Sequence, residues 1–220
     1  PVTASKFGGV PYLPAGVDAP LGSDGRPLGM IAQINCAELP QNTIYPESGM
    51  LQFWLNPRHP QWGMNINDGL VGAEARVIYW EELGAANPHA CAVEANWEEH
   101  YWPIDPPTRE ISLIFGPPET PDPMLTWGDH ERFIDIWNEL YPDQAIEEIE
   151  ELEDLVEEAE EDEDILSAIA DEAGYHQLGG YPVFFDDDPR RNNPELEEYT
   201  VNLLTMGSES NRLGSTELLW

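Results

Sequence analysis

The sequence of 220 residues is poor in basic residues and contains no long apolar run. Only 9 Lys and Arg face 43 Asp and Glu, which gives a net charge of −34, and Lys6 is the only lysine. This charge repels nucleic acid and anionic lipid at long range, so direct binding to either is not expected. Because no stretch of about 18 apolar residues is present, a membrane-spanning helix is excluded.

Cysteine is also scarce. Cys36 and Cys91 are too few for a disulfide framework in a chain of this length, and they lack the close spacing of a zinc site. The first nine residues lack the charged and apolar regions of a signal peptide. We therefore predict a cytoplasmic protein. The start at Pro1 and the abrupt end at Trp220 also predict that natural ends are missing.

The familiar signatures of enzymes are missing as well. The sequence holds no Gly-x-Ser-x-Gly, no phosphate-binding glycine loop, no dinucleotide fingerprint and no His-Glu-x-x-His. Its five histidines lie in different segments, and no two of them have the spacing of metal ligands on a helix. The sequence thus predicts neither a catalytic residue nor a cofactor.

Short apolar runs bounded by Pro and Gly dominate the first half of the chain. Such runs are typical of strands, and the 21 prolines and 18 glycines favour frequent turns. We predict strands over residues 30–35, 49–55, 76–80 and 110–115, and later over residues 183–185 and 199–204.

The middle of the chain has a helical pattern. Asp129 can cap a helix with Phe133 and Trp137 on one face, and apolar residues recur at three- and four-residue steps over residues 144–173. Residues 143–172 include 16 acids and no base. This acidity is consistent with either a solvated helix face or a surface for a basic partner.

One phrase occurs twice in the chain, at residues 7–12 and 178–183: an apolar residue, Gly-Gly, one residue, Pro. Paired glycines permit positive φ, and the proline fixes φ, so each copy predicts the same bend. The distance along the sequence from each bend also aligns Gln33 of the first copy with Thr205 of the second. We therefore predict an internally duplicated fold.

The predicted fold class is α+β, mainly antiparallel β, with an acidic helical segment between two halves. One domain spans residues 1–220. The first half-repeat covers about 1–118, the acidic helical segment about 129–173, and the second half-repeat begins at about 176 and is cut short at the C-terminus.

Two glutamines, Gln33 and Gln52, lie within apolar strands, where a buried amide needs hydrogen-bond partners. These amides can join the two halves by hydrogen bonds. Alternatively, with Tyr12 and Arg190 they can form a small polar cleft that binds a ligand.

Three consecutive aspartates, Asp186, Asp187 and Asp188, are the candidate metal ligands. Clustered hard oxygen atoms on a turn suit calcium or magnesium, although the spacing of an EF-hand is absent. The alternative is a polar turn in which Asp188 binds its own backbone or Arg190.

Several stretches together resemble the YwqG-like family, a bacterial domain of unknown function: residues 6–14, 27–28 with 32–35, 49–53, 176–182 and 188–190. The resemblance implies a duplicated, intracellular α+β fold with no established activity. Relatives can lie near polymorphic toxin genes, as immunity proteins do. Asp186 stands where the family commonly has Gln, and the family's ending beyond Trp220 is missing.

Two functions follow as hypotheses. The first is a non-enzymatic cytoplasmic binding protein, including an immunity-type role, whose acidic surface engages a basic protein. The second is a hydrolase, or a ligand- or metal-binding protein, with a site between the halves that uses Asp186 or Asp188. Adaptation to a salty cytoplasm is a third explanation of the charge.

Overall fold

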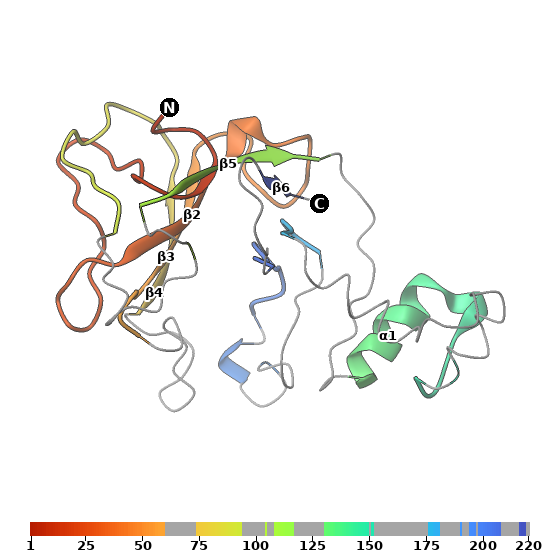
Figure 1. Ribbon diagram of the computed structural model, residues 1–220. Coiled ribbons are helices and arrows are strands. Elements are labelled where there is room, and N and C mark those ends of the chain that lie inside the picture. The colour runs from red at the N-terminus through yellow and green to blue at the C-terminus, as the bar shows by residue number, and fades with distance from the viewer. Residues whose placement is uncertain are drawn as a thin grey trace. The chain divides into compact units, whose positions relative to one another are not determined.

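The computed structural model describes eleven parts of the chain (Figure 1): residues 1–59, 74–93, 104, 108–116, 130–149, 151, 176–180, 190, 194–196, 198–207 and 216–218. The chain divides into two compact units. The first comprises Pro1–Phe115 with Leu213–Glu217, and the second comprises Gly116–Arg212 with Leu218–Trp220.

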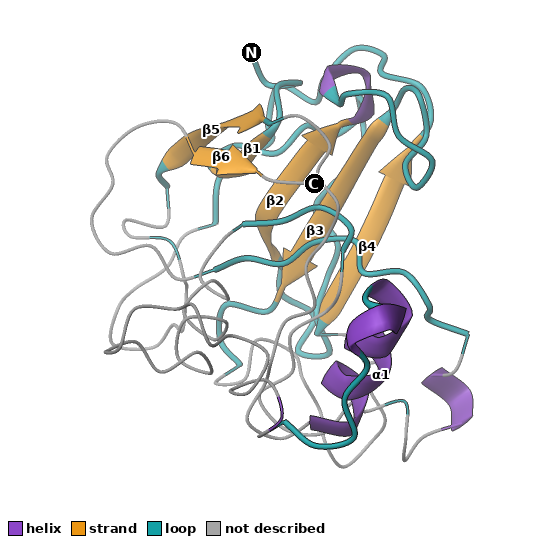
Figure 2. Cartoon of the chain, turned by 90° about the vertical axis from the view of Figure 1, so that its right-hand side faces the viewer, coloured by secondary structure: helices purple, strands orange, loops and turns teal. Residues whose placement is uncertain are grey.

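A six-stranded sheet forms the first unit, with the strand order β4-β3-β2-β1-β5-β6 (Figure 2). The pairings of β1 with β2 and β5, and of β3 with β2 and β4, are all antiparallel. The strands are β1 (Lys6–Gly8), β2 (Gly29–Asn35), β3 (Met50–Leu55), β4 (Ala75–Trp80), β5 (Glu110–Phe115) and β6 (Thr216–Leu218).

The centre of this sheet is buried because β2 and β3 are apolar along most of their length. Met30 pairs with Trp54, and together with Leu13 and Leu28 these residues form one core cluster. Burying each such side chain contributes about 1.5–3 kcal/mol. A register shift between Met30 and Ala32 marks a bulge in β2.

The helical elements are short. One α-helix, α1 (His130–Leu140), is described, with three 3₁₀ turns, η1 (Cys36–Glu38), η2 (Pro142–Gln144) and η4 (Pro194–Leu196). The α1 helix matches the helix predicted after Asp129, and it ends before Tyr141 because the following Pro142 disfavours helical φ and ψ there. No helix of the described residues is long and apolar enough to cross a membrane.

The predicted α+β class with an acidic helical segment between two halves is wrong. The structure is mainly an antiparallel sheet, and α1 is the one α-helix whose bounds lie within the described residues, where Glu151 is a further single helical residue. No helix begins at Gln144. Instead, Asn138 accepts a hydrogen bond from the Ile146 N–H at 2.8 Å and donates to the Ile146 carbonyl at 2.9 Å, which folds the chain back on α1. Residues 152–175 lie outside the described residues.

Four predicted strands are confirmed as β2, β3, β4 and β5. The strand predicted over residues 199–204 is wrong: Tyr199 and Val201 are more than half exposed, and only Thr205 forms an isolated bridge, with Gln177. The strand predicted over residues 183–185 lies outside the described residues. The short strands β1 and β6 were not predicted.

Candidate functional site

Three of the four predicted ligand-binding residues meet in the first unit. Gln33 of β2 and Gln52 of β3 are paired across the sheet, and both are fully buried with Tyr12. The Tyr12 N–H donates to Gln33 Oε1 at 2.9 Å, and Gln52 Nε2 donates to the Tyr12 carbonyl at 2.6 Å. A further bond of 3.3 Å runs from Gln52 Nε2 to Gln33 Oε1. The two amides thus hold the segment that follows the first Gly-Gly bend.

The remaining polar atoms of this pair are also used. Gln33 Nε2 donates to the carbonyls of Val2 and Ala4, each at 2.7 Å. Trp80 Nε1 donates to Gln52 Oε1 at 2.8 Å. Every amide hydrogen of the pair therefore has an acceptor inside the protein, so a ligand could bind these amides only by replacing existing hydrogen bonds. The arrangement ties the N-terminal segment to the sheet, and ligand binding here stays a prediction.

The fourth predicted ligand-binding residue, Arg190, belongs to the second unit. Its guanidinium donates to the Tyr199 carbonyl at 3.0 Å. The predicted metal ligands Asp186, Asp187 and Asp188 lie outside the described residues. Within the described parts of the chain, no group of three or more His, Cys, Asp or Glu side chains could hold a metal ion.

The first Gly-Gly bend contains a polar contact that the sequence did not predict. Lys6 is 1% exposed, and its ammonium lies 2.7 Å from Glu110 Oε2, 104 residues away in sequence. A buried ammonium requires such a partner. A Cβ at Gly9 would lie only 2.7 Å from Glu110 Oε2, and at Gly8 only 2.4 Å from the Arg109 carbonyl. The glycines therefore let β5 approach closely enough for the ion pair.

The second Gly-Gly bend has the same local geometry. φ is 63° and 69° at Gly8 and Gly9, and 73° and 67° at Gly179 and Gly180. Lys6, two residues before the first pair, is paired with Gln33; Gln177, two residues before the second, is bridged to Thr205. These are the positions that the repeated phrase aligns, whereas duplication of the remaining residues stays a prediction.

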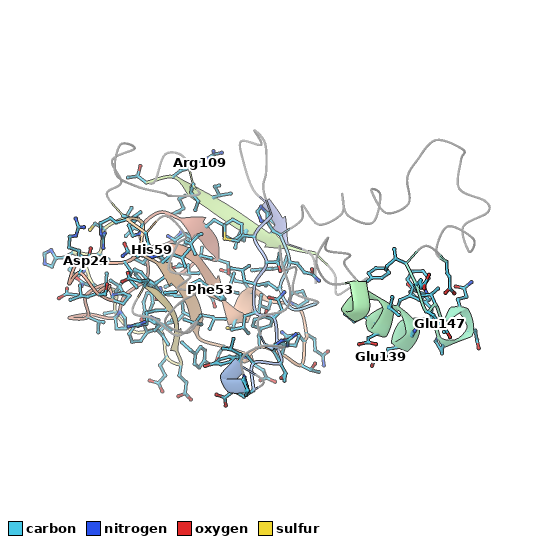
Figure 3. All side chains as sticks on the ribbon, turned by 90° about the horizontal axis from the view of Figure 1, so that it is seen from below. Asp24, Phe53, His59, Arg109, Glu139 and Glu147 are labelled. Atoms are coloured by element: carbon cyan, nitrogen blue, oxygen red, sulfur yellow. The ribbon has the colours of Figure 1, made fainter. Side chains whose placement is uncertain are left out.

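A charged cluster that sequence reasoning missed lies on the turn at residues 22–27 (Figure 3, Asp24). Arg58 Nε donates to Asp24 Oδ2 at 2.8 Å, and Arg26 Nε donates to the same oxygen at 2.8 Å. The hydrogen bond from Arg58 and the backbone N–H of Arg26 hold the pKa of Asp24 far below its usual range. The Asp-Gly-Arg sequence indicates the turn, but nothing local indicates Arg58.

Glu74 holds the other end of this turn. It accepts from the Ser23 hydroxyl and from Asn56 Nδ2. The Ser23 hydrogen bond, with a smaller contribution from Asn56, lowers the pKa of Glu74 although burial opposes the shift. Both carboxylates are thus bound within the protein and serve the turn rather than an exposed site.

The buried thiol of Cys36 is not an activated nucleophile. Cys36 is buried, and burial raises the pKa of its thiol, which keeps it protonated and unreactive. Cys91 is exposed.

A compact hairpin forms around α1 in the second unit. Phe133 packs against Ile146 and Ile149, and Trp137 joins this cluster while donating through Nε1 to the Gln144 carbonyl at 2.8 Å. The apolar side chains therefore turn towards one another, and the acidic residues whose side chains are described face solvent.

The outer surface of this hairpin is acidic. Figure 3 shows Glu139 on α1 and Glu147 on the turn that follows. None of its exposed carboxylates has a cationic partner among the described residues, whose ion pairs join Glu110 and Asp24 to Lys6, Arg26 and Arg58. We call this surface the acidic face; its residues are Asp135, Glu139, Asp143, Glu147, Glu148 and Glu151.

Comparison with known proteins adds one match. A family model described as "Domain of unknown function (DUF1963)" matches residues 5–218. This match spans both Gly-Gly bends, the buried amide pair and the acidic face. No curated protein is similar enough to the chain to count as a match. Since the family model covers nearly the whole sequence, the chain belongs to the family of domains of unknown function DUF1963.

Proposed function

We propose that this protein is a non-enzymatic, cytoplasmic, YwqG-like binding protein that engages a basic protein through its acidic face. The observation that carries the proposal is that the six carboxylates of the acidic face are exposed and have no cationic partner in the described structure. An immunity-type role against a basic toxin is one form of this function.

The charge of the whole chain supports the same proposal. A net charge of −34 creates a field that attracts a cationic protein before contact and can raise association rates by one or more orders of magnitude. The described bases do little to reduce this field locally, because Lys6 and Arg58 are already paired with carboxylates. The carboxylates of the acidic face, which have no cationic partner among the described residues, provide a defined binding surface for such a protein.

The alternative function, a hydrolase or a ligand- or metal-binding protein with a site between the halves, rests on Asp186 and Asp188. These residues lie outside the described parts of the chain. That function therefore remains a prediction, and calorimetric titration with calcium, magnesium and manganese would test it directly.

A stopped-flow experiment tests the proposed function. The protein is labelled at the exposed Cys91 and mixed with a basic test protein of isoelectric point above 9, in NaCl from 0.02 to 0.5 M. Attraction between exposed charges is screened over about 8 Å at physiological ionic strength, so the association rate should fall at least about tenfold over this range. An association rate that does not change with salt would contradict the proposal.

A matched pair of variants tests where the partner binds. Neutralising Glu139, Glu147 and Glu148 with glutamine removes three charges from the acidic face. The control carries Asp18→Asn, Glu47→Gln and Glu198→Gln, which removes the same charge from other exposed positions. The first variant should lose more affinity than the control. Equal losses would assign the attraction to net charge alone.

A further inference from the structure

β4 lies at one end of the sheet, and one of its edges has no strand beside it in the described structure (Figure 2). It pairs with β3 over six consecutive residues without a bulge, from Ala75 to Trp80. The strand contains no proline and no lysine. Soluble proteins commonly protect an edge strand with a bulge, a proline or a lysine, because an unpaired edge is a template for another strand.

The register identifies the backbone groups that face outwards. The Asn56 N–H donates to the Glu74 carbonyl at 2.7 Å, which makes this pair a hydrogen-bonded pair of the β3–β4 ladder. In an antiparallel ladder, hydrogen-bonded and non-bonded pairs alternate. The backbone groups of residues 76, 78 and 80 therefore bind β3, and those of Ala75, Val77 and Tyr79 point away from the sheet.

Two of these three residues are open to a new strand. The Ala75 carbonyl already accepts a hydrogen bond of 2.8 Å from the Arg76 guanidinium. The outward groups of Val77 and Tyr79 have no backbone partner among the described residues. Their side chains lie on one face of the strand and are 55% and 41% exposed. A flat, exposed strand edge with adjoining apolar side chains is suited to β-augmentation.

The charges around β4 decide which occupant fits. Glu81 and Glu82 follow the strand directly, and both are exposed. A second copy of the chain would bring another charge of −34, so pairing between two copies is opposed by repulsion at low salt. A basic segment is attracted instead. Arg76 is the one cation on the strand, and its guanidinium is folded onto the Ala75 carbonyl.

We propose that the outer edge of β4 binds an extended, basic segment of the partner protein as an added strand. This inference rests on the proposed function and adds, in the first unit, a second contact of the partner to the one proposed at the acidic face. The segment exchanges main-chain hydrogen bonds with Val77 and Tyr79, places apolar side chains against theirs, and brings Lys or Arg close to Glu81 and Glu82. Specificity then comes from alternation of apolar and basic residues.

Peptide binding to the full chain tests the proposal. The probe is a ten-residue peptide of alternating Val and Lys, and fluorescence anisotropy measures its affinity. A matched peptide carries N-methyl groups on alternate residues, which removes main-chain donors and keeps the charge. A second control peptide alternates Val and Glu and so reverses the charge. We expect the methylated peptide and the Val-Glu peptide each to bind at least about tenfold more weakly than the Val-Lys peptide.

Variants of the chain locate the site. Val77→Pro removes an outward N–H and no ladder bond, so it should weaken the Val-Lys peptide about tenfold. Val77→Lys should weaken it similarly through repulsion, and this second variant serves if the proline variant fails to fold. Ile114→Lys is the control, since Ile114 is 55% exposed on β5, which is separated from β4 by β3, β2 and β1, and the charge change is the same. The control should bind like the parent protein.

Several outcomes would overturn the proposal. These are the absence of Val-Lys peptide binding, equal binding of the methylated peptide, or unchanged affinity in both Val77 variants. Dimerisation at low salt that is abolished by Val77→Pro, measured by analytical ultracentrifugation, would assign the edge to a second copy. If one of these results is found while association with the basic test protein still depends on salt, the β4 proposal fails and the proposed function stands. Peptide binding without that salt dependence contradicts the proposed function alone.

Discussion

Gln33, Gln52 and Lys6 bury polar groups in the first unit, and each finds its partners in segments distant in sequence. A buried polar group that loses its partner costs more than the lost bond contributed, because the remaining group stays desolvated. Substitutions at these residues should therefore reveal whether the network stabilises the fold, as its closed hydrogen bonding indicates.

Gln52→Leu should destabilise the protein by about 2–4 kcal/mol, since it leaves the buried Tyr12 carbonyl and Trp80 Nε1 without their partner. Urea unfolding monitored by tryptophan fluorescence measures the change. Gln41→Leu, at an exposed position, is the control and should stay within about 0.5 kcal/mol of the parent. A loss at Gln52 no larger than the control's would mean that the network adds nothing to stability.

Gly9→Ala should destabilise by about 2 kcal/mol or more, because a Cβ there meets Glu110 at 2.7–2.8 Å in addition to the cost of positive φ. Gly16→Ala is the matched control: its φ is +80°, and a Cβ there meets nothing within 4 Å. The control should lose only the backbone cost of about 1–2 kcal/mol. Equal losses at the two glycines would show that close approach to β5 is not what requires Gly9.

The pH dependence of stability should include a contribution from Asp24. Its pKa in the folded protein lies below that of the unfolded chain, about 3.9, so the stabilisation is present above that pH and is lost as the pH falls towards the folded value. Asp24→Asn should be less stable than the parent at pH 6 and should lose less stability between pH 5 and pH 3. Urea midpoints across this range measure both effects.

Asp18→Asn provides the control for the pH experiment, because Asp18 is exposed and has no ion-pair partner among the described residues. It should follow the parent curve closely. If the Asp24 variant also follows the parent curve, the contacts of Asp24 with Arg58 and Arg26 contribute no pH-dependent stability.

At the scale of elements, the hairpin around α1 is held in part by one polar side chain. Asn138 holds both backbone groups of Ile146, so Asn138→Ala should release the turn and expose Ile146. Hydrogen exchange of the Ile146 amide should accelerate about tenfold for a loss of about 1.4 kcal/mol. Glu139→Ala, one residue further along α1 and exposed, should leave that exchange rate unchanged. Unchanged exchange in Asn138→Ala would contradict this role.

The elements also show what local sequence can predict. Apolar runs between Pro and Gly predicted β2, β3, β4 and β5, because their side chains follow the burial pattern of a sheet. β1 was missed, since its three residues are too few for a periodic pattern. The run at residues 199–204 is also rich in apolar residues, but none of these residues is assigned to a strand in the described structure, where the bridge to Gln177 is formed by Thr205. Such tertiary pairing cannot be derived from propensity.

The same limit applies to the sites. Two amides within apolar strands predicted that Gln33 and Gln52 need partners, and they are paired in register. Lys6 and Glu110 are 104 residues apart, and Asp24 and Arg58 are 34 apart, so neither ion pair has a local signal. The helix predicted over residues 144–173 does not begin at Gln144, because periodicity does not reveal that Asn138 competes for the backbone of Ile146. Glu151 is helical, and residues 152–173 lie outside the described residues.

At the scale of the whole molecule, the net charge of −34 should make folding depend on salt. Like charges are closer together in the compact state than in the unfolded chain, so self-repulsion destabilises the folded protein, and screening relieves it. We expect the urea midpoint to rise steadily between 0.02 and 0.5 M NaCl.

Sucrose is the control, because it stabilises compact states by exclusion from the protein surface and does not screen charge. Its effect on the urea midpoint therefore shows how much stabilisation arises without screening. At low salt the triple variant Glu139→Gln, Glu147→Gln, Glu148→Gln should begin at a higher urea midpoint and rise less with NaCl, because it carries three fewer negative charges. A midpoint that falls with NaCl would mean that attractive pairs such as Asp24 with Arg58 outweigh the repulsion, and that the acidity is balanced within the fold rather than left available to a partner.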